Sequence, residues 1–258
     1  MSSIHGTFIW YELMTSDSKA AEPFYRSVIG WDAKDSGMAD HPYTLLSVGP
    51  TQVGGLMPIP DAARAMGARP CWTGCVAVDD VDVFAARVTA AGGAVHRAGE
   101  DIPGVGRFAV VADPYGAVFI LFKGRSDQAP TPVALGTPGH VGWHELQAGS
   151  LDGAFAFYAG LFGWTKAEAV DMGSMGTYQL FATGGAPVGG MMTKMAEVPS
   201  PFWLYYFNVD AIDAAAARAT HGGGQVINGP MEVPGGAWIV QCVDPQGAMF
   251  AMVAAKRG

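Results

Sequence analysis

The alternation of apolar and polar residues predicts the same strand and helix at the start of each half of the chain. The stretch TFIWYEL alternates as a strand that places Phe8, Trp10 and Glu12 on one face. Asp17 then occupies the N-cap position of the helix SKAAEPFYRSVI. In the second half, Ser150 stands in the same way before the helix LDGAFAFYAGLF.

A second helix and a closing hairpin are predicted in each half. The helices VDVFAARVTAA and AIDAAAARATH follow Asp80 and Asp210 as candidate N-caps, and glycine ends each of them. The turns DPYG and DPQG carry proline and glycine at the positions that a type I turn favours. Hydrogen bonding within the turn explains the aspartates Asp113 and Asp244. The order strand, helix, strands therefore occurs twice in each half.

The repeat between the halves indicates duplication of a whole domain. At an offset of 133 residues, 10–31 and 143–164 share eight of 22 residues. The stretch KGRSDQAPTPVALGTPG between the halves is rich in proline, glycine and small polar residues, which is typical of a linker. We expect two like domains, over 1–124 and 140–258, joined by a linker over 125–139 and associated within the chain.

Four motifs recur in the same order in both halves. They are a strand and helix with PFY or AFY, a Gly-Trp pair, a Val-Asp pair near the second helix, and DP-x-G before the last apolar strand. This order resembles the vicinal oxygen chelate superfamily, which includes glyoxalase I, extradiol dioxygenases and bleomycin resistance proteins. The resemblance implies an α+β fold of two tandem domains, each of paired βαβββ modules whose mixed sheet curls into a half-open cup for the ligand.

The superfamily holds a metal through His and Glu, and the metal chelates two neighbouring oxygens of the substrate. The aligned positions here lack such side chains, so we expect no family-type metal site and no cofactor. His140 and His144, like Cys71 and Cys75, lie four residues apart, which on a strand is about 13 Å and too far to share one ion. The residues at the ligand positions are Trp10, Thr73, Ile120, Trp143, Leu204 and Ala251.

A tryptophan and a glutamate two residues apart recur in both halves, as Trp10 with Glu12 and Trp143 with Glu145. The resemblance places this face of the strand inside the cup. A carboxylate aimed into an apolar cavity is a candidate general acid or base, or pairs with a cationic ligand group or an internal arginine such as Arg107. Alternatively, the tryptophans fill volume, and each glutamate accepts backbone N–H bonds at a strand end.

Repeated aromatic and methionine positions supply further candidates for the walls of the cups. Methionine is adaptable and lines many ligand surfaces, although it also fills cores. The first copy has Tyr11 and Arg107 where the second has His144 and Trp238, so the two cups need not be equivalent. The candidate catalytic residues are Glu12 and Glu145, and the candidate substrate-binding residues are Trp10, Trp143, Tyr43, Tyr178, Met57, Met191, Trp72, Trp203 and Arg107.

Composition and charge narrow the class of partner. The net charge of −8 argues against nucleic acid and anionic membrane surfaces, and the apolar fraction of 50% provides for a core and apolar cavities. No apolar run reaches the roughly 18 residues that span a bilayer, and the N-terminus lacks a secretion signal. Three cysteines without a disulfide spacing fit a reducing compartment. We expect a cytoplasmic protein that binds a small molecule, as a monomer with paired domains or a weak homodimer.

Three functions remain open from the sequence. The first is a metal-independent lyase or isomerase that acts on a small, largely apolar or aromatic molecule, with Glu12 or Glu145 moving a proton. The second is a binding protein that sequesters a drug or metabolite, for which acidic charge and aromatic walls suit a cationic ligand. The third is a metal-dependent glyoxalase or extradiol dioxygenase, which the resemblance allows and the aligned residues oppose.

Overall fold

The fold was analysed in a computed structural model that describes residues 4–38, 42–125 and 133–258. Part of the predicted linker, 126–132, lies outside the described residues. The first half contains the helices α1 (Ser18–Ile29), α2 (Asp61–Ala65) and α3 (Val81–Ala90). Its strands are β1 (Phe8–Thr15), β2 (Asp32–Asp35), β3 (Thr44–Val48), β4 (Thr51–Pro58), β5 (Cys71–Ala77), β6 (Ala94–Ile102), β7 (Gly106–Ala112) and β8 (Val118–Gly124).

The second half repeats this series of elements. Its helices are α4 (Leu151–Phe162), the short 3-10 turn η1 (Gly173–Met175) and α5 (Ile212–His221). Its strands are β9 (Val141–Ala148), β10 (Thr165–Asp171), β11 (Thr177–Ala182), β12 (Pro187–Thr193), β13 (Phe202–Asn208), β14 (Gln225–Glu232), β15 (Trp238–Val243) and β16 (Met249–Ala254).

Each half forms one open, mixed sheet of eight strands. The first has the order β2-β3-β4-β1-β5-β8-β7-β6, and the second has the matching order β10-β11-β12-β9-β13-β16-β15-β14. The pairs β1 with β4, β5 with β8, β9 with β12 and β13 with β16 are parallel. The predicted α+β fold of two tandem domains with βαβββ modules is therefore confirmed.

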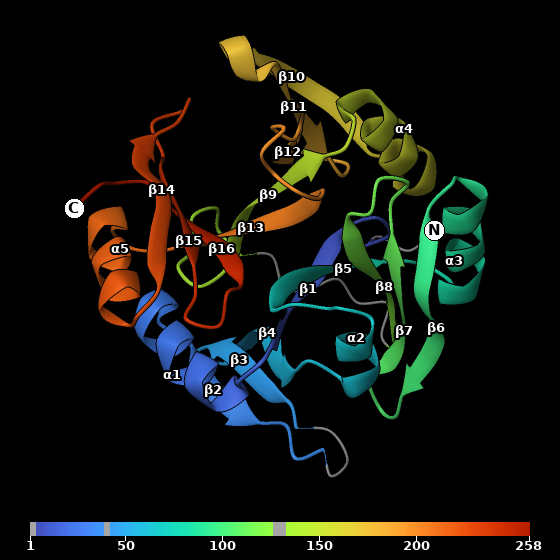
Figure 1. Cartoon of the computed structure of the whole chain (residues 1–258), viewed down its shortest axis with the longest axis horizontal. Helices are drawn as coiled ribbons and strands as arrows, with labels where there is room; N and C mark the ends of the chain where they lie inside the picture. The colour runs from blue at the N-terminus through green and yellow to red at the C-terminus, as the bar shows by residue number, and fades with distance from the viewer. Residues whose placement is uncertain (1–3, 39–41, 126–132) are drawn as a thin grey trace. The chain divides into compact units, whose positions relative to one another are not determined.

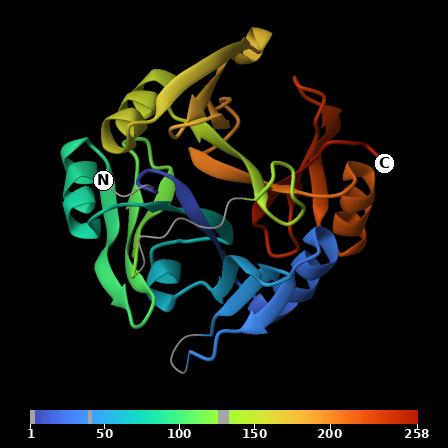
Figure 2. The ribbon, with the colours of Figure 1, turned by 180° about the vertical axis from the view of Figure 1, so that it is seen from behind.

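The chain also divides into two compact units that combine segments of both halves. Unit 1 contains Met1–Ile9, Gly74–Pro132 and His144–Trp203. Unit 2 contains Trp10–Thr73, Val133–Trp143 and Leu204–Gly258. In each unit, helices from different halves are neighbours: α3 lies beside α4 in unit 1, and α1 lies beside α5 in unit 2 (Figures 1 and 2).

The helix starts follow the predicted capping residues with one exception. Asp17 accepts a hydrogen bond from the backbone N–H of Ala20, and Ser150 and Asp80 cap α4 and α3 in the same way. The prediction for Asp210 is wrong, because α5 begins at Ile212 and its N-cap is Ala211, which makes no side-chain bond. Asp210 thus lies one residue too early to satisfy the first N–H groups of the helix.

A tyrosine from one half donates a hydrogen bond to the turn aspartate of the other half in both units. Tyr25 Oη donates to Asp244 Oδ2 over 3.0 Å in unit 2, and Tyr158 Oη donates to Asp113 Oδ2 over 3.4 Å in unit 1. Each tyrosine also accepts the indole N–H of a buried tryptophan, which is Trp72 for Tyr25 (2.9 Å) and Trp203 for Tyr158 (3.0 Å). The PFY, AFY and DP-x-G motifs therefore join the two halves within each unit.

The aspartates in these bonds also hold their own turns, as predicted. Asp113 Oδ1 accepts the N–H groups of Tyr115 and Ala117, and Asp244 Oδ1 accepts those of the corresponding turn. Burial raises the pKa of both carboxyls, and the turn N–H groups oppose that rise. Both oxygens of each carboxyl thus have protein partners in the buried core.

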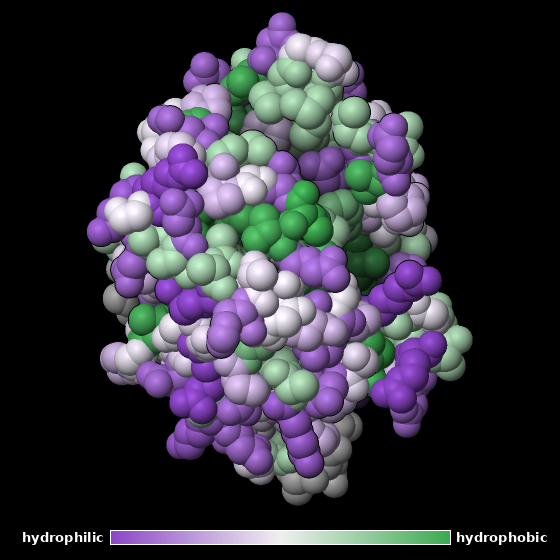
Figure 3. Space-filling model, turned by 60° about the vertical axis from the view of Figure 1, so that its left-hand side comes forward, coloured by the Kyte–Doolittle hydropathy of each residue, from purple (hydrophilic) through white to green (hydrophobic). Residues whose placement is uncertain are grey.

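The surface mixes apolar and polar residues. Figure 3 shows one face on which a group of strongly apolar residues lies among hydrophilic ones. This distribution follows from a composition in which only 15% of residues are charged. None of the helices in the described part of the chain has the length and apolarity needed to cross a bilayer.

We predict that Tyr25→Phe destabilises the protein by about 1–3 kcal/mol, because it leaves the Trp72 N–H and an Asp244 oxygen buried without this partner. Tyr158→Phe is the matched control and should lose less, because its bond to Asp113 is longer. Urea unfolding of the two variants measures the difference. Losses below about 0.5 kcal/mol in both would contradict the role given to these bonds.

Candidate functional site

Glu145 stands on a strand face that the alternation of β9 sets apart from the core. His144, Leu146 and Ala148 point to the buried side, whereas Glu145 and Gln147 point to the other side. We call this side of β9, β11 and β12 the Glu145 face; it carries Glu145, Gln147, Tyr178 and Met192. All of these residues belong to unit 1.

Both oxygens of the Glu145 carboxyl accept hydrogen bonds on this face. Tyr178 Oη donates to Oε2 over 3.2 Å, and Gln147 Nε2 donates to Oε1 over 2.8 Å. The residue is only 8% exposed, so these bonds replace water around the carboxylate. Tyr178 and Gln147 therefore fix the direction in which Glu145 presents its oxygens.

The Gly-Gly motif of β12 makes this arrangement possible. Gly190 pairs with Glu145 in the parallel register, and the ring of Tyr178 lies directly over Gly190. A β-carbon at Gly190 would overlap with that ring. The glycine is thus required because the tyrosine has to cross the strand to reach the carboxylate.

The first half has a similar arrangement with one residue changed. Tyr43 lies over Gly55, which pairs with Glu12, and its hydroxyl accepts the indole N–H of Trp10 over 2.9 Å. Methionine stands at position 14, where the second half has Gln147. The two copies of the Trp-Glu motif are therefore not equivalent, in keeping with the divergence expected from the sequence.

A cysteine lies near Glu12 in unit 2. Burial raises the pKa of the Cys71 thiol, and the charge of Glu12 adds to the rise. The Cys71 sulfur lies 3.8 Å from the hydroxyl oxygen of Thr73. A thiol with a raised pKa is protonated at neutral pH and is a poor nucleophile.

Several residues predicted to bind the substrate lie elsewhere. Trp72 and Trp203 are each 5% exposed and give their indole N–H groups to the tyrosines of the core. Met191 is fully buried and pairs with Leu146, so it belongs to the core side of β12. The residue that pairs with Gln147 on the Glu145 face is Met192, the second methionine of the same Gly-Gly-Met-Met stretch.

Met57, the other methionine predicted to bind the substrate, lies on the same side of the first sheet as Glu12. Met57 is half-buried and pairs with Met14, two residues beyond Glu12 along β1. Alternation along β1 places Trp10, Glu12 and Met14 on one side. Trp143 occupies the matching position on β9, two residues before Glu145.

Arg107 pairs with aspartates of its own unit. Its guanidinium donates to both oxygens of Asp82 (2.9 and 3.0 Å), to Asp101 (3.0 Å) and to the carbonyl of Gly99 (2.9 Å). The two aspartates hold the pKa of Arg107 above its ordinary value. The guanidinium is therefore engaged by α3 and β6, which is not the carboxylate-pairing role considered from the sequence.

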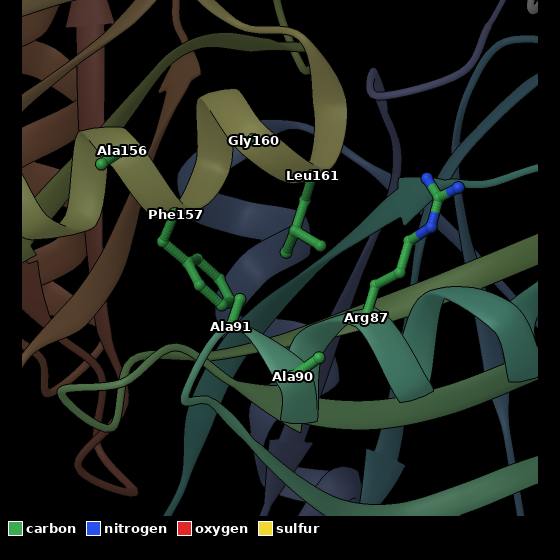
Figure 4. A pocket seen from close by; sticks show the side chains of 7 residues that line it. All are labelled: Arg87, Ala90, Ala91, Ala156, Phe157, Gly160 and Leu161. Carbon is green, nitrogen blue, oxygen red and sulfur yellow. The ribbon is translucent and has the colours of Figure 1, made fainter.

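An open depression lies between α3 and α4 (Figure 4). It follows from a difference in helix packing between the two units. Ala91 stands there at the position that Gly222 occupies in the repeat, and a β-carbon at Gly222 would come within 2.9 Å of the Phe24 ring. In unit 2, Arg218 donates to the carbonyl of Val28, whereas in unit 1 the guanidinium of Arg87 lies over the Phe84 ring, 4.7 Å from its centroid. The lining residues are Arg87, Ala90, Ala91, Ala156, Phe157, Gly160 and Leu161.

The described donor set does not fit a metal of the kind that the superfamily holds. Within residues 4–38, 42–125 and 133–258, no three His, Cys, Asp or Glu side chains come together closely enough to bind one ion. Indole, methyl and isobutyl groups occupy family ligand positions at Trp143, Ala251 and Leu204. We therefore derive no chemical step through a metal.

A comparison with protein families agrees with the repeated modules and sheets of the fold. The family model for the Glyoxalase/Bleomycin resistance protein/Dioxygenase superfamily matches residues 7–121 and 137–252. The chain belongs to this superfamily. The resemblance found in the sequence is thereby confirmed for both halves.

Two similar relatives within the superfamily cover nearly the whole chain. "Putative glyoxylase CFP32" of Mycobacterium bovis is 35% identical over 251 residues, which are 96% of this chain and 94% of the relative. "Anthracycline biosynthesis protein DnrV" of Streptomyces peucetius is 33% identical over 269 residues, which cover 98% of this chain and 94% of the relative. The similarity therefore extends along nearly the full length of these proteins.

Solved structures of the superfamily show the same fold at low identity. The Mn(II)-bound glyoxalase from Novosphingobium aromaticivorans has a TM-score of 0.64 at 18% identity and covers 96% of this chain and 81% of its own. The 2,2',3-trihydroxybiphenyl 1,2-dioxygenase from Sphingomonas wittichii strain RW1 has a TM-score of 0.65 at 13% identity, with 98% and 91% covered. At these identities the likeness concerns the fold alone.

His144 lies behind the Glu145 face and is held neutral. It is 7% exposed, its Nδ1 lies 2.7 Å from the carbonyl of Val188, and its ring stacks on Phe8 with centroids 4.3 Å apart. Burial lowers the pKa of His144 to about 4, against the effect of the Val188 carbonyl. The imidazole is therefore a neutral part of the packing that supports β9.

We predict that this histidine makes stability fall as the pH decreases from about 6.5 to about 4. Over that range His144 binds a proton in the unfolded chain but stays neutral in the folded protein. This difference lowers the free energy of unfolding by up to roughly 3 kcal/mol. His144→Tyr, which introduces the residue of the equivalent position Tyr11, should abolish this component. The measurement is urea unfolding at a series of pH values, and equal pH dependence of the variant and the parent protein would contradict it.

Proposed function

We propose that this protein binds an uncharged aromatic ketone and that Glu145 removes a proton from the carbon next to the carbonyl. The observation that carries the proposal is the carboxylate of Glu145, which is 8% exposed and accepts hydrogen bonds on both oxygens. A carboxylate held in this way in an apolar surrounding is equipped for general base catalysis. Membership of the superfamily supports a small-molecule substrate.

The chemical step would be an enolisation. Glu145 takes the proton, the C–H electron pair forms a carbon–carbon double bond, and the carbonyl electron pair moves onto the oxygen. In a ketone with a β,γ carbon–carbon double bond, return of the proton from the Glu145 carboxylic acid to the γ carbon of the dienolate completes an isomerisation. In a ketone with a leaving group on the β carbon, re-formation of the carbonyl and departure of that group with its bonding electron pair complete an elimination. Tyr178 and Gln147 keep the carboxyl in place during both transfers.

The relatives support the aromatic part of this proposal. DnrV of Streptomyces peucetius and DauV of Streptomyces sp. strain C5 are both named for anthracycline biosynthesis, and DauV is 32% identical over 263 residues. Met192 beside Gln147 supplies an adaptable apolar surface for a flat ring. An uncharged ligand suits this face better than an anion, because an anion would be repelled by Glu145.

We predict that the protein accelerates hydrogen–deuterium exchange at carbon 2 of 1-tetralone in D2O and that Glu145→Gln slows this exchange by about 10²- to 10⁴-fold. Glutamine keeps the shape and a hydrogen-bonding capacity, so the fold should remain. Glu12→Gln is the matched control and should retain most of the rate, because Met14 stands where Gln147 holds the second carboxylate and has no amide to hold Glu12. Nuclear magnetic resonance measures the exchange directly.

Three outcomes separate the alternatives. Equal rates for the parent protein and both glutamine variants would contradict the role of Glu145. Tight binding of 1-tetralone without exchange above the buffer rate would favour the sequestering protein of the bleomycin-resistance type. Loss of exchange only in Glu12→Gln would move the reaction to the first half.

We further predict that this exchange does not require a transition metal. The family ligand positions carry side chains such as Trp143, Leu204 and Ala251, which offer no donor atoms for an ion. Elemental analysis after dialysis against a chelator should find well below one equivalent of metal per chain, with the exchange rate unchanged. One equivalent of Fe, Zn, Ni or Mn that resists dialysis would contradict this prediction.

A further inference from the structure

A row of four residues crosses the strands of unit 2. Tyr206 on β13 pairs with Ala251 on β16, Ala251 pairs with Gln241 on β15, and Gln241 pairs with Asn228 on β14. Residues paired in this way point to the same face of a sheet. We call these four residues the Tyr206 row.

Hydrogen bonds connect the polar members of this row in one direction. Asn228 Nδ2 donates to Gln241 Oε1 over 3.2 Å, and Gln241 Nε2 donates to Tyr206 Oη over 2.7 Å. The methyl group of Ala251 lies between Gln241 and Tyr206 in the register, and its small size lets the amide reach across. Tyr206 and Ala251 are 2% and 0% exposed, Gln241 is half-buried and Asn228 is exposed.

Tyr206 and Ala251 form the buried inner end of the row, and its outer end lies on the more accessible face of β15 and β16. On the opposite face, Val240, Cys242, Phe250 and Met252 are each 0% exposed. The neighbours of the row on its own face are apolar and only half-buried; they are Ile239, Val243, Met249 and Val253. A few fixed polar groups within an apolar, accessible surface are typical of a small-molecule site.

The corresponding row of unit 1 shows that the fold does not need these hydrogen bonds. In the same register, Cys75 pairs with Ile120, Ile120 with Val110, and Val110 with Arg97. Isoleucine replaces the alanine, valine replaces the glutamine, and Arg97 is bound to Glu100 over 2.7 Å. Packing alone therefore satisfies this position of the sheet, and the polar row of unit 2 has to be explained by something else.

We propose that the Tyr206 row is a binding site for a neutral oxygen, a carbonyl or a hydroxyl, of an uncharged and largely apolar ligand. Amides and a phenol offer both donors and acceptors without a formal charge, so they match such an oxygen without the desolvation penalty of burying an ion. The bond between Gln241 and Tyr206 fixes the amide plane, and Asn228 fixes which end of that amide is the donor. The site goes beyond the proton transfer proposed for Glu145 and does not rest on it.

The test compares two probes that differ in one oxygen, 1-tetralone and tetralin. We expect calorimetry on the full chain to give tighter binding of the ketone, and Gln241→Met to weaken ketone binding by roughly 5- to 10-fold, the value of one neutral hydrogen bond. Tetralin binding should not change, because methionine keeps the length and apolar area of the side chain. Val110→Met, the matched change in unit 1, should alter neither affinity.

A second variant protects the test against misfolding. Asn228→Ala changes an exposed side chain and should reduce the preference for the ketone by a smaller factor. Equal binding of both probes by the parent protein, binding of neither at millimolar concentration, or an unchanged preference in Gln241→Met and Asn228→Ala would overturn the proposal. Because calorimetry measures binding without turnover, a failure of the parent protein in the exchange assay would leave this result intact.

Discussion

The hydrogen bond from a buried tyrosine to a turn aspartate is the interaction on which the rest of the structure depends. Tyr25 and Asp244 lie 219 residues apart in sequence, and their bond joins the first module of one half to the last module of the other. Loss of the tyrosine would destabilise the fold, because the carboxyl of the aspartate is buried and its other oxygen already accepts the N–H groups of a tight turn. Tyr158 and Asp113 repeat the constraint in unit 1.

This constraint explains which repeated residues had to stay alike and which could diverge. The two halves are joined by the tyrosines, the aspartates and the tryptophans that donate to the tyrosines, so these residues recur at matching positions. Residues on the accessible faces of the sheets do not take part in these contacts between the halves. There the halves differ, with Gln147 against Met14 and Gln241 against Val110. Differences between the copies therefore fall at positions that the contacts between the halves do not fix.

The sequence predicted the fold well because its signals are redundant. The repeat, the caps at Asp17 and Ser150 and the DP-x-G turns all agree with the same order of modules. Asp210 failed because an N-cap depends on where the first helical residue falls, and that start moved by one position. Element boundaries depend on local geometry that the residue type alone does not fix.

The site was predicted less well because a strand's two faces differ by a single residue. Met191 and Met192 are neighbours in sequence, yet one is in the core and the other is beside Gln147. Trp72 and Trp203 looked like ligand-binding aromatics, but their indole N–H groups are needed by Tyr25 and Tyr158. Gln147 could have been found, since it follows Glu145 by two residues on the same strand.

Neutral hydrogen-bonded groups occupy part of the surface at which the superfamily places a metal ligand. Ala251 stands at one ligand position, and its small side chain is what allows Gln241 to meet Tyr206. Such a bond contributes only about 1 kcal/mol to stability, but it adds no buried charge that folding has to compensate. The half with Ile120 at the matching position packs without any such bond. One copy can therefore carry ligand recognition while the other serves the packing alone.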